Sequence, residues 1–103
     1  MSKKIKSEKI KLFVDDIRNP EHLGLEGWTI ARTSKRAIAI LSQGNVVECS
    51  LDHDLGGDDT GYKVICWMEN NGVIPENGIS CHSSNPVGRE KINMVIRKIS
   101  NML

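Results

Sequence analysis

Three short polar clusters each follow an apolar run, and all three contain side chains that can do acid–base or phosphate chemistry. They are the pair Asp15-Asp16, the triplet Asp52-His53-Asp54, and the run of residues 82–85, His-Ser-Ser-Asn. Carboxylates are ligands that Mg²⁺ accepts in proteins. Imidazoles, whose unperturbed pKa lies near neutral pH, can give and take protons. The clusters therefore indicate a site that handles a charged ligand or a proton transfer.

The apolar runs before the clusters predict the strands of a parallel sheet. Strands are expected over 10–14, 28–32, 46–51 and 79–82, and helices over 35–42, 61–70 and 87–102. Residues 21–27 allow at most one helical turn, because Gly24 and Gly27 weaken it. Strands that alternate with helices favour a flavodoxin-like α/β fold. We expect three layers, α/β/α, around a parallel sheet of about four strands in the order 2-1-3-4.

In that order the first, third and fourth strands are neighbours, so their three polar clusters meet at one edge of the sheet. Ligands bind outside the carboxyl ends of the strands in such sheets. Mg²⁺ could be held there by Asp15, Asp16, Asp52 and Asp54, while His53 and His82 could form an acid–base pair. The residue types leave open whether a metal is needed. Arg18, Arg89 and the backbone near Asn85 are candidates for binding a phosphate. Asp58 and Asp59 fall outside this convergence and are predicted to be surface acids in a flexible turn.

Composition narrows the class of protein. The chain has 103 residues, 39% of them hydrophobic and 26% charged, with a net charge of +1. This fits one domain over residues 10–103 behind a polar, flexible tail of residues 1–9, and gives no strong field for nucleic acid or membranes. Three cysteines without metal-binding spacing favour reduced thiols in a cytoplasmic protein. No phosphate-binding loop, dinucleotide fingerprint or serine-nucleophile elbow is present. Monomer and small homo-oligomer both remain open.

Two of the clusters resemble the acidic motifs of bacterial receiver domains, the phospho-accepting modules of two-component signalling. Residues 12–16, Leu-Phe-Val-Asp-Asp, are similar to the pair after the first receiver strand. Residues 51–55, Leu-Asp-His-Asp-Leu, place Asp52 at the phospho-acceptor position. Receivers also have a fifth strand that ends in a lysine, and no such strand is predicted here.

Residues 14–20, 51–56 and 81–88 together are more similar to the cyclic-phosphate processing receiver-like domains of bacteria and phages, over 12–95. That resemblance implies hydrolysis of a cyclic phosphate, carried by an RNA end or a nucleotide as the partner. It implies catalytic roles for His53, His82, Asp52 and Asp15. The remaining candidate site residues are the phosphate-binding Arg18, Ser83, Asn85 and Arg89 and the metal-binding Asp16 and Asp54.

Two other functions stay open. The domain could bind a cyclic nucleotide or a protein without any chemistry, or it could accept a phosphoryl group on Asp52. The absence of the receiver lysine argues against the second of these.

Overall fold

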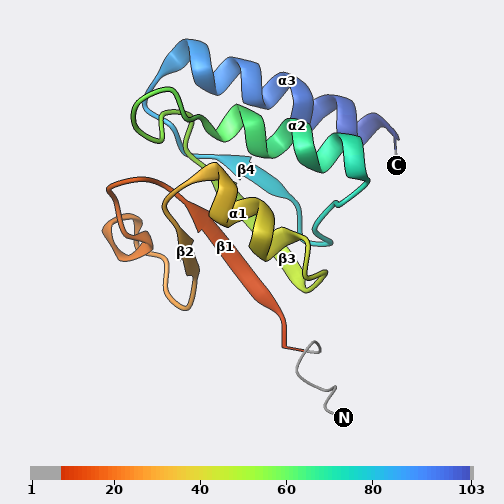
Figure 1. Cartoon of the computed structure of the whole chain (residues 1–103), viewed down its shortest axis with the longest axis horizontal. Coiled ribbons are helices and arrows are strands. Elements are labelled where there is room, and N and C mark those ends of the chain that lie inside the picture. The colour runs from red at the N-terminus through yellow and green to blue at the C-terminus, as the bar shows by residue number, and fades with distance from the viewer. Residues whose placement is uncertain (1–7, 103) are drawn as a thin grey trace.

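The computed structural model describes residues 8–102 and contains a four-stranded, wholly parallel sheet (Figure 1). Its strands are β1 (Ile10–Val14), β2 (Thr29–Ala31), β3 (Val46–Leu51) and β4 (Ile79–Cys81), in the order β2-β1-β3-β4. The predicted order 2-1-3-4 is therefore confirmed. Of the predicted N-terminal tail, residues 1–7 lie outside the described part of the chain.

Three α-helices and one 3₁₀ turn connect and follow the strands. They are the turn η2 (Pro20–Leu23), α1 (Ser34–Leu41), α2 (Gly61–Asn71) and α3 (Pro86–Met102). Thr33 is the N-cap of α1, because its side-chain oxygen accepts a hydrogen bond from the Arg36 amide at 3.1 Å. Gly72 ends α2 in the left-handed conformation, with φ of 65°.

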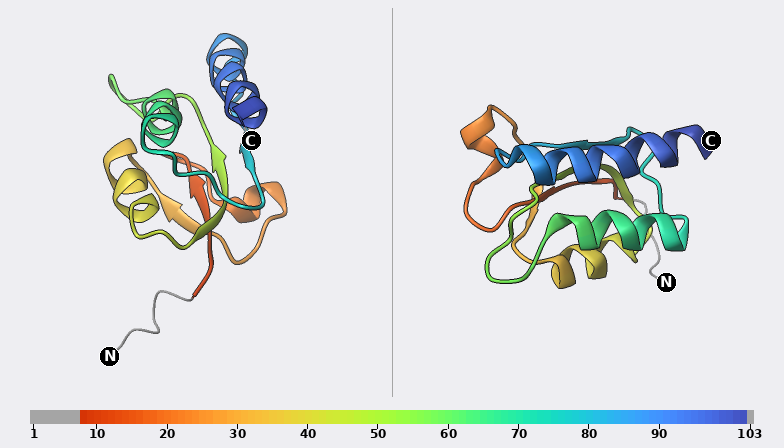
Figure 2. Two further views of the ribbon diagram at one scale, coloured as in Figure 1. Left: turned by 90° about the vertical axis from the view of Figure 1, so that its right-hand side faces the viewer. Right: turned by 90° about the horizontal axis from the view of Figure 1, so that it is seen from above.

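α1 and α2 cover one face of the sheet, η2 lies on the other, and α3 lies beside α2 along the β4 edge (Figure 2). The chain moves one way across the sheet from β1 to β2 and the opposite way from β2 through β3 to β4. Since parallel crossovers are right-handed, η2 must lie on the opposite face from the crossover helices α1 and α2. The third layer of the predicted arrangement is thus reduced to η2 and its flanking loops.

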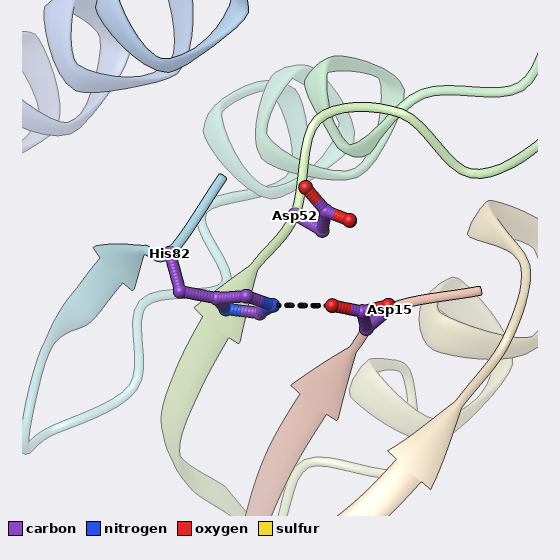
Figure 3. A group of neighbouring side chains, drawn as sticks. All are labelled: Asp15, Asp52 and His82. Atoms are coloured by element: carbon purple, nitrogen blue, oxygen red, sulfur yellow. Dashed lines mark hydrogen bonds and ion pairs between the residues drawn. The ribbon is translucent and has the colours of Figure 1, made fainter. Parts of the chain in front are cut away.

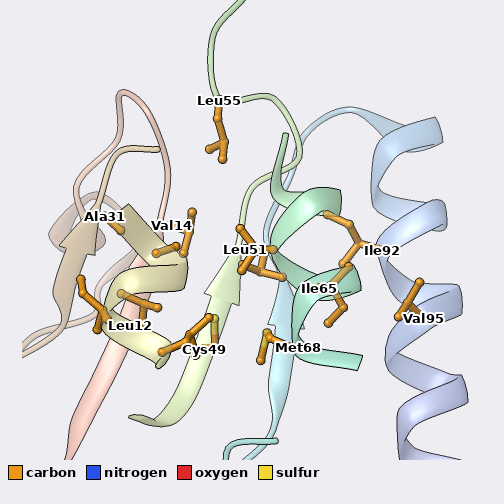
Figure 4. Packing of buried hydrophobic residues seen from close by; sticks show 14 of the residues in the cluster. Leu12, Val14, Ala31, Cys49, Leu51, Leu55, Ile65, Met68, Ile92 and Val95 are labelled. Atoms are coloured by element: carbon orange, nitrogen blue, oxygen red, sulfur yellow. The ribbon is translucent and has the colours of Figure 1, made fainter. Parts of the chain in front are cut away.

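The hydrophobic core lies between the sheet and the three helices (Figure 4). Alternate side chains of β1 and β3 point into it and meet apolar side chains of α2 and α3: Leu12, Val14, Cys49, Leu51, Val64, Ile65, Met68, Ile92 and Ile99. Burial raises the pKa of the Cys49 thiol to about 12, so it stays protonated. All three cysteines are free thiols. No helix in the described range 8–102 has the length and apolar character needed to cross a membrane.

Candidate active site

One row of the sheet positions the central residues of the site. Val14, Leu51 and Cys81 are register partners across β1, β3 and β4. The residue that follows each of them is polar, so the row continues past the strand ends as Asp15, Asp52 and His82 (Figure 3). One oxygen or nitrogen atom from each lies within 4.8 Å of those of the other two. The structure therefore brings together one residue from each of the three predicted clusters.

Asp15 is 1% exposed, and four donors contact its carboxylate. Oδ1 accepts hydrogen bonds from the amides of Ile17 at 2.9 Å and Arg18 at 2.8 Å. Oδ2 is 3.0 Å from Nε2 of His82 and 3.2 Å from Nε of Arg18. Burial by itself would raise the pKa of Asp15, but these hydrogen bonds and the charge of Arg18 outweigh it and hold the pKa below its ordinary value. Asp15 is accordingly an anion at neutral pH.

His82 reaches from β4 across β3 to Asp15 on β1 (Figure 3). Its ring stacks on Phe13, with centroids 4.3 Å apart and planes within 7°. Burial lowers the pKa of His82, and the carboxylates of Asp15 and Asp52 only partly oppose that shift. The imidazole is therefore neutral at neutral pH, and it becomes a comparatively strong acid once it is protonated.

Asp52 is 8% exposed, and its pKa is shifted in the opposite direction to that of Asp15. Its Oδ1 accepts a hydrogen bond from the His53 amide at 2.8 Å, and Oδ2 lies 3.8 Å from Nη2 of Arg18. Burial raises the pKa of Asp52, and the negative charge of Asp15 raises it further, while the Ser83 hydroxyl among other groups acts against the shift. Asp52 is consequently a stronger base than an ordinary aspartate.

A pocket of about 440 Å³ opens above these residues. Its walls are mainly charged and come from the loops after β1, β3 and β4: Asp15, Asp16, Ile17, Arg18, Asp52, Asp54 and Ser84. Four carboxylates thus face one guanidinium. A bare phosphate would meet net repulsion here, so positive charge beyond Arg18 is needed for tight binding. Asp15 and Asp52 offer carboxylate oxygens to a cation, and Asp16 and Asp54 border the same space. Both nitrogens of His82 are already hydrogen-bonded, to Asp15 and Ser50.

The other predicted site residues tie the loops together. Nδ1 of His53 is 2.9 Å from Oδ1 of Asp54, and the hydrogen bonds from His53 and Asn85 lower the pKa of Asp54. Nδ2 of Asn85 donates to Oδ2 of Asp54 at 3.2 Å. Arg89 donates to the Ser83 carbonyl at 3.0 Å. The His53 ring packs against Gly88 of α3, outside the Asp15, Asp52 and His82 cluster. The expected pairing of His53 with His82 as acid and base stays a prediction.

Asp59 corrects one expectation from the sequence. It was predicted to be a surface acid in a flexible turn, but it accepts hydrogen bonds from the Ser34 amide at 2.8 Å and the Ser34 hydroxyl at 2.5 Å. These bonds fix the loop after β3 to the start of α1. Asp58 is exposed, as predicted.

Three supporting residues escaped the sequence analysis. Arg32 donates to the backbone oxygens of Asp15 at 3.3 Å and Arg18 at 2.8 Å, which anchors the loop that carries Arg18. Ser50 and Phe13 hold the His82 ring. The position of Arg32 directly after β2 was the signal that could have revealed it, since β2 pairs with β1.

Comparison with known proteins identifies one family. The family model described as "Cyclic-phosphate processing Receiver domain" matches residues 10–98, from the start of β1 to within α3. No curated protein and no solved structure matches the chain.

Proposed function

The chain belongs to the family of cyclic-phosphate processing receiver domains, and on that premise we propose that it hydrolyses a cyclic phosphate on an RNA end or a nucleotide. The observation that carries the proposal is the meeting of Asp15, Asp52 and His82 beside a pocket that Asp15, Asp52 and Arg18 line. The two carboxyl groups have pKa values shifted in opposite directions, a pattern typical of acid–base sites.

Arg18 binds the phosphate in this proposal. Its guanidinium lies between the carboxylates of Asp15 and Asp52 and borders the pocket. A planar guanidinium can donate to two phosphate oxygens at once and stabilise the charge that builds on them during displacement. The hydrogen bonds of Asp15 to the Arg18 side chain and amide keep this group in place.

In this proposal Asp52 is the general base and His82 is the general acid. Asp52 takes a proton from the attacking water as the water oxygen bonds to phosphorus. The bond from phosphorus to one sugar oxygen breaks, and that oxygen takes a proton from protonated His82. A proton passed from Asp52 to His82 afterwards restores both groups. Asp52 suits the base because its pKa is raised, and His82 suits the acid because its pKa is lowered.

A divalent cation such as Mg²⁺ fits the carboxylates of the pocket. Asp15 and Asp52 would hold it, with Asp16 and Asp54 as further ligands at the same edge. When bound, it would offset the negative charge of the pocket and stabilise the anionic phosphate. The phosphate would then lie between two positive charges: the guanidinium of Arg18 and the cation held by the carboxylates.

The test is turnover of a 2′,3′-cyclic nucleotide, and of a short RNA ending in a cyclic phosphate, by the whole chain with Mg²⁺. We expect Asp52→Asn and His82→Ala each to lower kcat by about 10²–10⁴-fold, the usual contribution of one acid–base group. The exposed Asp58 provides the matched control, Asp58→Asn, which should retain full activity. Undiminished turnover in both site variants would disprove this mechanism. Tight binding with all ligand recovered intact would instead identify a non-catalytic binding module.

A further inference from the structure

The His82 ring is held at three points. Its Nδ1 lies 2.7 Å from Oγ of Ser50, its Nε2 lies 3.0 Å from Oδ2 of Asp15, and its face stacks on Phe13. His82 follows β4 and Asp15 follows β1, with β3 between them. Neighbouring strands are about 4.8 Å apart, so the ring must lie over β3 to bridge the gap. The β3 residue beneath it is Ser50, which is small and only 5% exposed.

The hydrogen-bond partners decide where the protons lie. Asp15 also accepts from the amides of Ile17 and Arg18 and from Nε of Arg18, so its carboxylate acts purely as an acceptor. Nε2 of His82 must then carry a hydrogen. In the neutral ring Nδ1 is an acceptor, and the Ser50 hydroxyl donates to it.

We propose that Ser50 is the positioning residue of the site: it fixes the orientation of the His82 ring, with Nε2 directed at Asp15. This inference rests on the proposed function, because it assigns a task to Ser50 in that reaction. A hydroxyl is suited to the task because it donates to Nδ1 of the ring while Asp15 accepts from Nε2.

Ser50 does not act as a nucleophile. It lies within β3 rather than after it, and the His82 ring covers it. The pocket walls are formed by residues of the loops beyond the strand ends. Ser50 therefore affects the reaction only through His82.

Three variants test the proposal in the whole chain. Ser50→Ala removes the hydroxyl, and Ser50→Cys replaces it with a weaker donor of similar size. Ser80→Ala is the matched control, because Ser80 is the exposed register partner of Ser50 on β4. Turnover of a 2′,3′-cyclic nucleotide gives kcat and KM. Nitrogen-15 NMR of the His82 ring reports which nitrogen carries hydrogen.

We expect Ser50→Ala to lower kcat by about 10–100-fold, by analogy with the loss seen when the hydrogen-bond partner of a metal-ligating histidine is removed, with little change in KM. Ser50→Cys should be intermediate and Ser80→Ala should match the wild type. In Ser50→Ala the Nδ1 signal should shift because this nitrogen loses the hydrogen bond from the hydroxyl, while Nε2, still bonded to Asp15, should change less. Unchanged ring signals in Ser50→Ala would overturn the proposal, and so would unchanged kcat in an active enzyme. If the wild type lacks turnover, the proposed function fails, and the NMR comparison still decides the role of Ser50.

Discussion

Gly61 offers a sharp test of how tightly the site is packed. It is the first residue of α2, and its amide donates to the His53 carbonyl at 2.8 Å. A Cβ added here would overlap the carbonyl oxygen of Asp52 and come within 3.1 Å of its carbonyl carbon. The obstacle is backbone, and it is fixed, because the Asp52 amide donates to the Val14 carbonyl at 2.8 Å. Gly61→Ala must therefore push α2 away from the loop that carries Asp52.

Two effects of opposite sign determine how much Gly61→Ala changes the free energy of unfolding. Alanine is a better helix former than glycine by about 0.8–1.0 kcal/mol in a helix interior, and by less at a first position. Overpacking costs about 1–3 kcal/mol, and a backbone obstacle places the cost near the upper end. The variant should lose about 2 kcal/mol of unfolding free energy, which corresponds to a fall in Tm of roughly 8–16 °C for a domain of this size. Helix propensity alone predicts the opposite sign.

Gly88→Ala is the matched control. Gly88 is also buried and helical, but its added Cβ would meet the His53 ring rather than backbone. The ring must shift and its hydrogen bond to Asp54 is disturbed, but no backbone has to move, so the loss should be smaller than that of Gly61→Ala. Urea and thermal unfolding followed by circular dichroism measure both variants. Equal stability of Gly61→Ala and the wild type, or equal losses in the two variants, would refute the reasoning. Turnover by Gly88→Ala also shows whether the position of His53 matters to the reaction.

Three further predictions follow from the charges and hydrogen bonds of the site. Without a divalent cation, the pH profile of kcat/KM should be a bell whose acidic limb lies above 3.8, because burial and Asp15 raise the pKa of Asp52, and whose alkaline limb lies below 6.5, because burial lowers the pKa of His82; an optimum above pH 7 would contradict both assignments. Mg²⁺ should raise the Tm of the wild type, since a ligand of the folded state stabilises it, and should raise that of Asp52→Asn less; equal shifts would argue against a cation at Asp52. Asp59→Ala should cost about 1–3 kcal/mol of unfolding free energy by leaving Ser34 unpaired, while Asp58→Ala should stay within about 0.5 kcal/mol in the same urea titration.

The sheet and the meeting of the three clusters could be predicted because the apolar runs end in register. Val14, Leu51 and Cys81 are the last strand residues, and each is followed at once by a polar residue. Strand ends that align in a parallel sheet must place those next residues side by side. Once the strand order is known, the ends of the apolar runs therefore predict that Asp15, Asp52 and His82 lie side by side.

The orientation of the His53 ring could not be predicted in the same way. It follows Asp52 directly, and successive side chains of an extended chain point to opposite sides. Asp52 faces the pocket, so His53 turns towards Gly88 and α3. Two histidines after neighbouring strands suggest a pair, but the position within each turn decides where each ring points. Asp59 shows a second limit, since its partner Ser34 lies 25 residues away in the chain.

The face of the sheet that lacks α-helices explains how the site is supported. Asp15, Asp52 and His82 continue the side-chain alternation of Phe13, Ser50 and Ser80, which belong to the face opposite the helical core. Of the elements within residues 8–102, η2 and its loops lie on that side, so the His82 ring has room to lie flat across β3. A full helix packed there would fill the space with apolar side chains. The reduced third layer is thus the condition that lets one imidazole connect β4 to the carboxylate after β1.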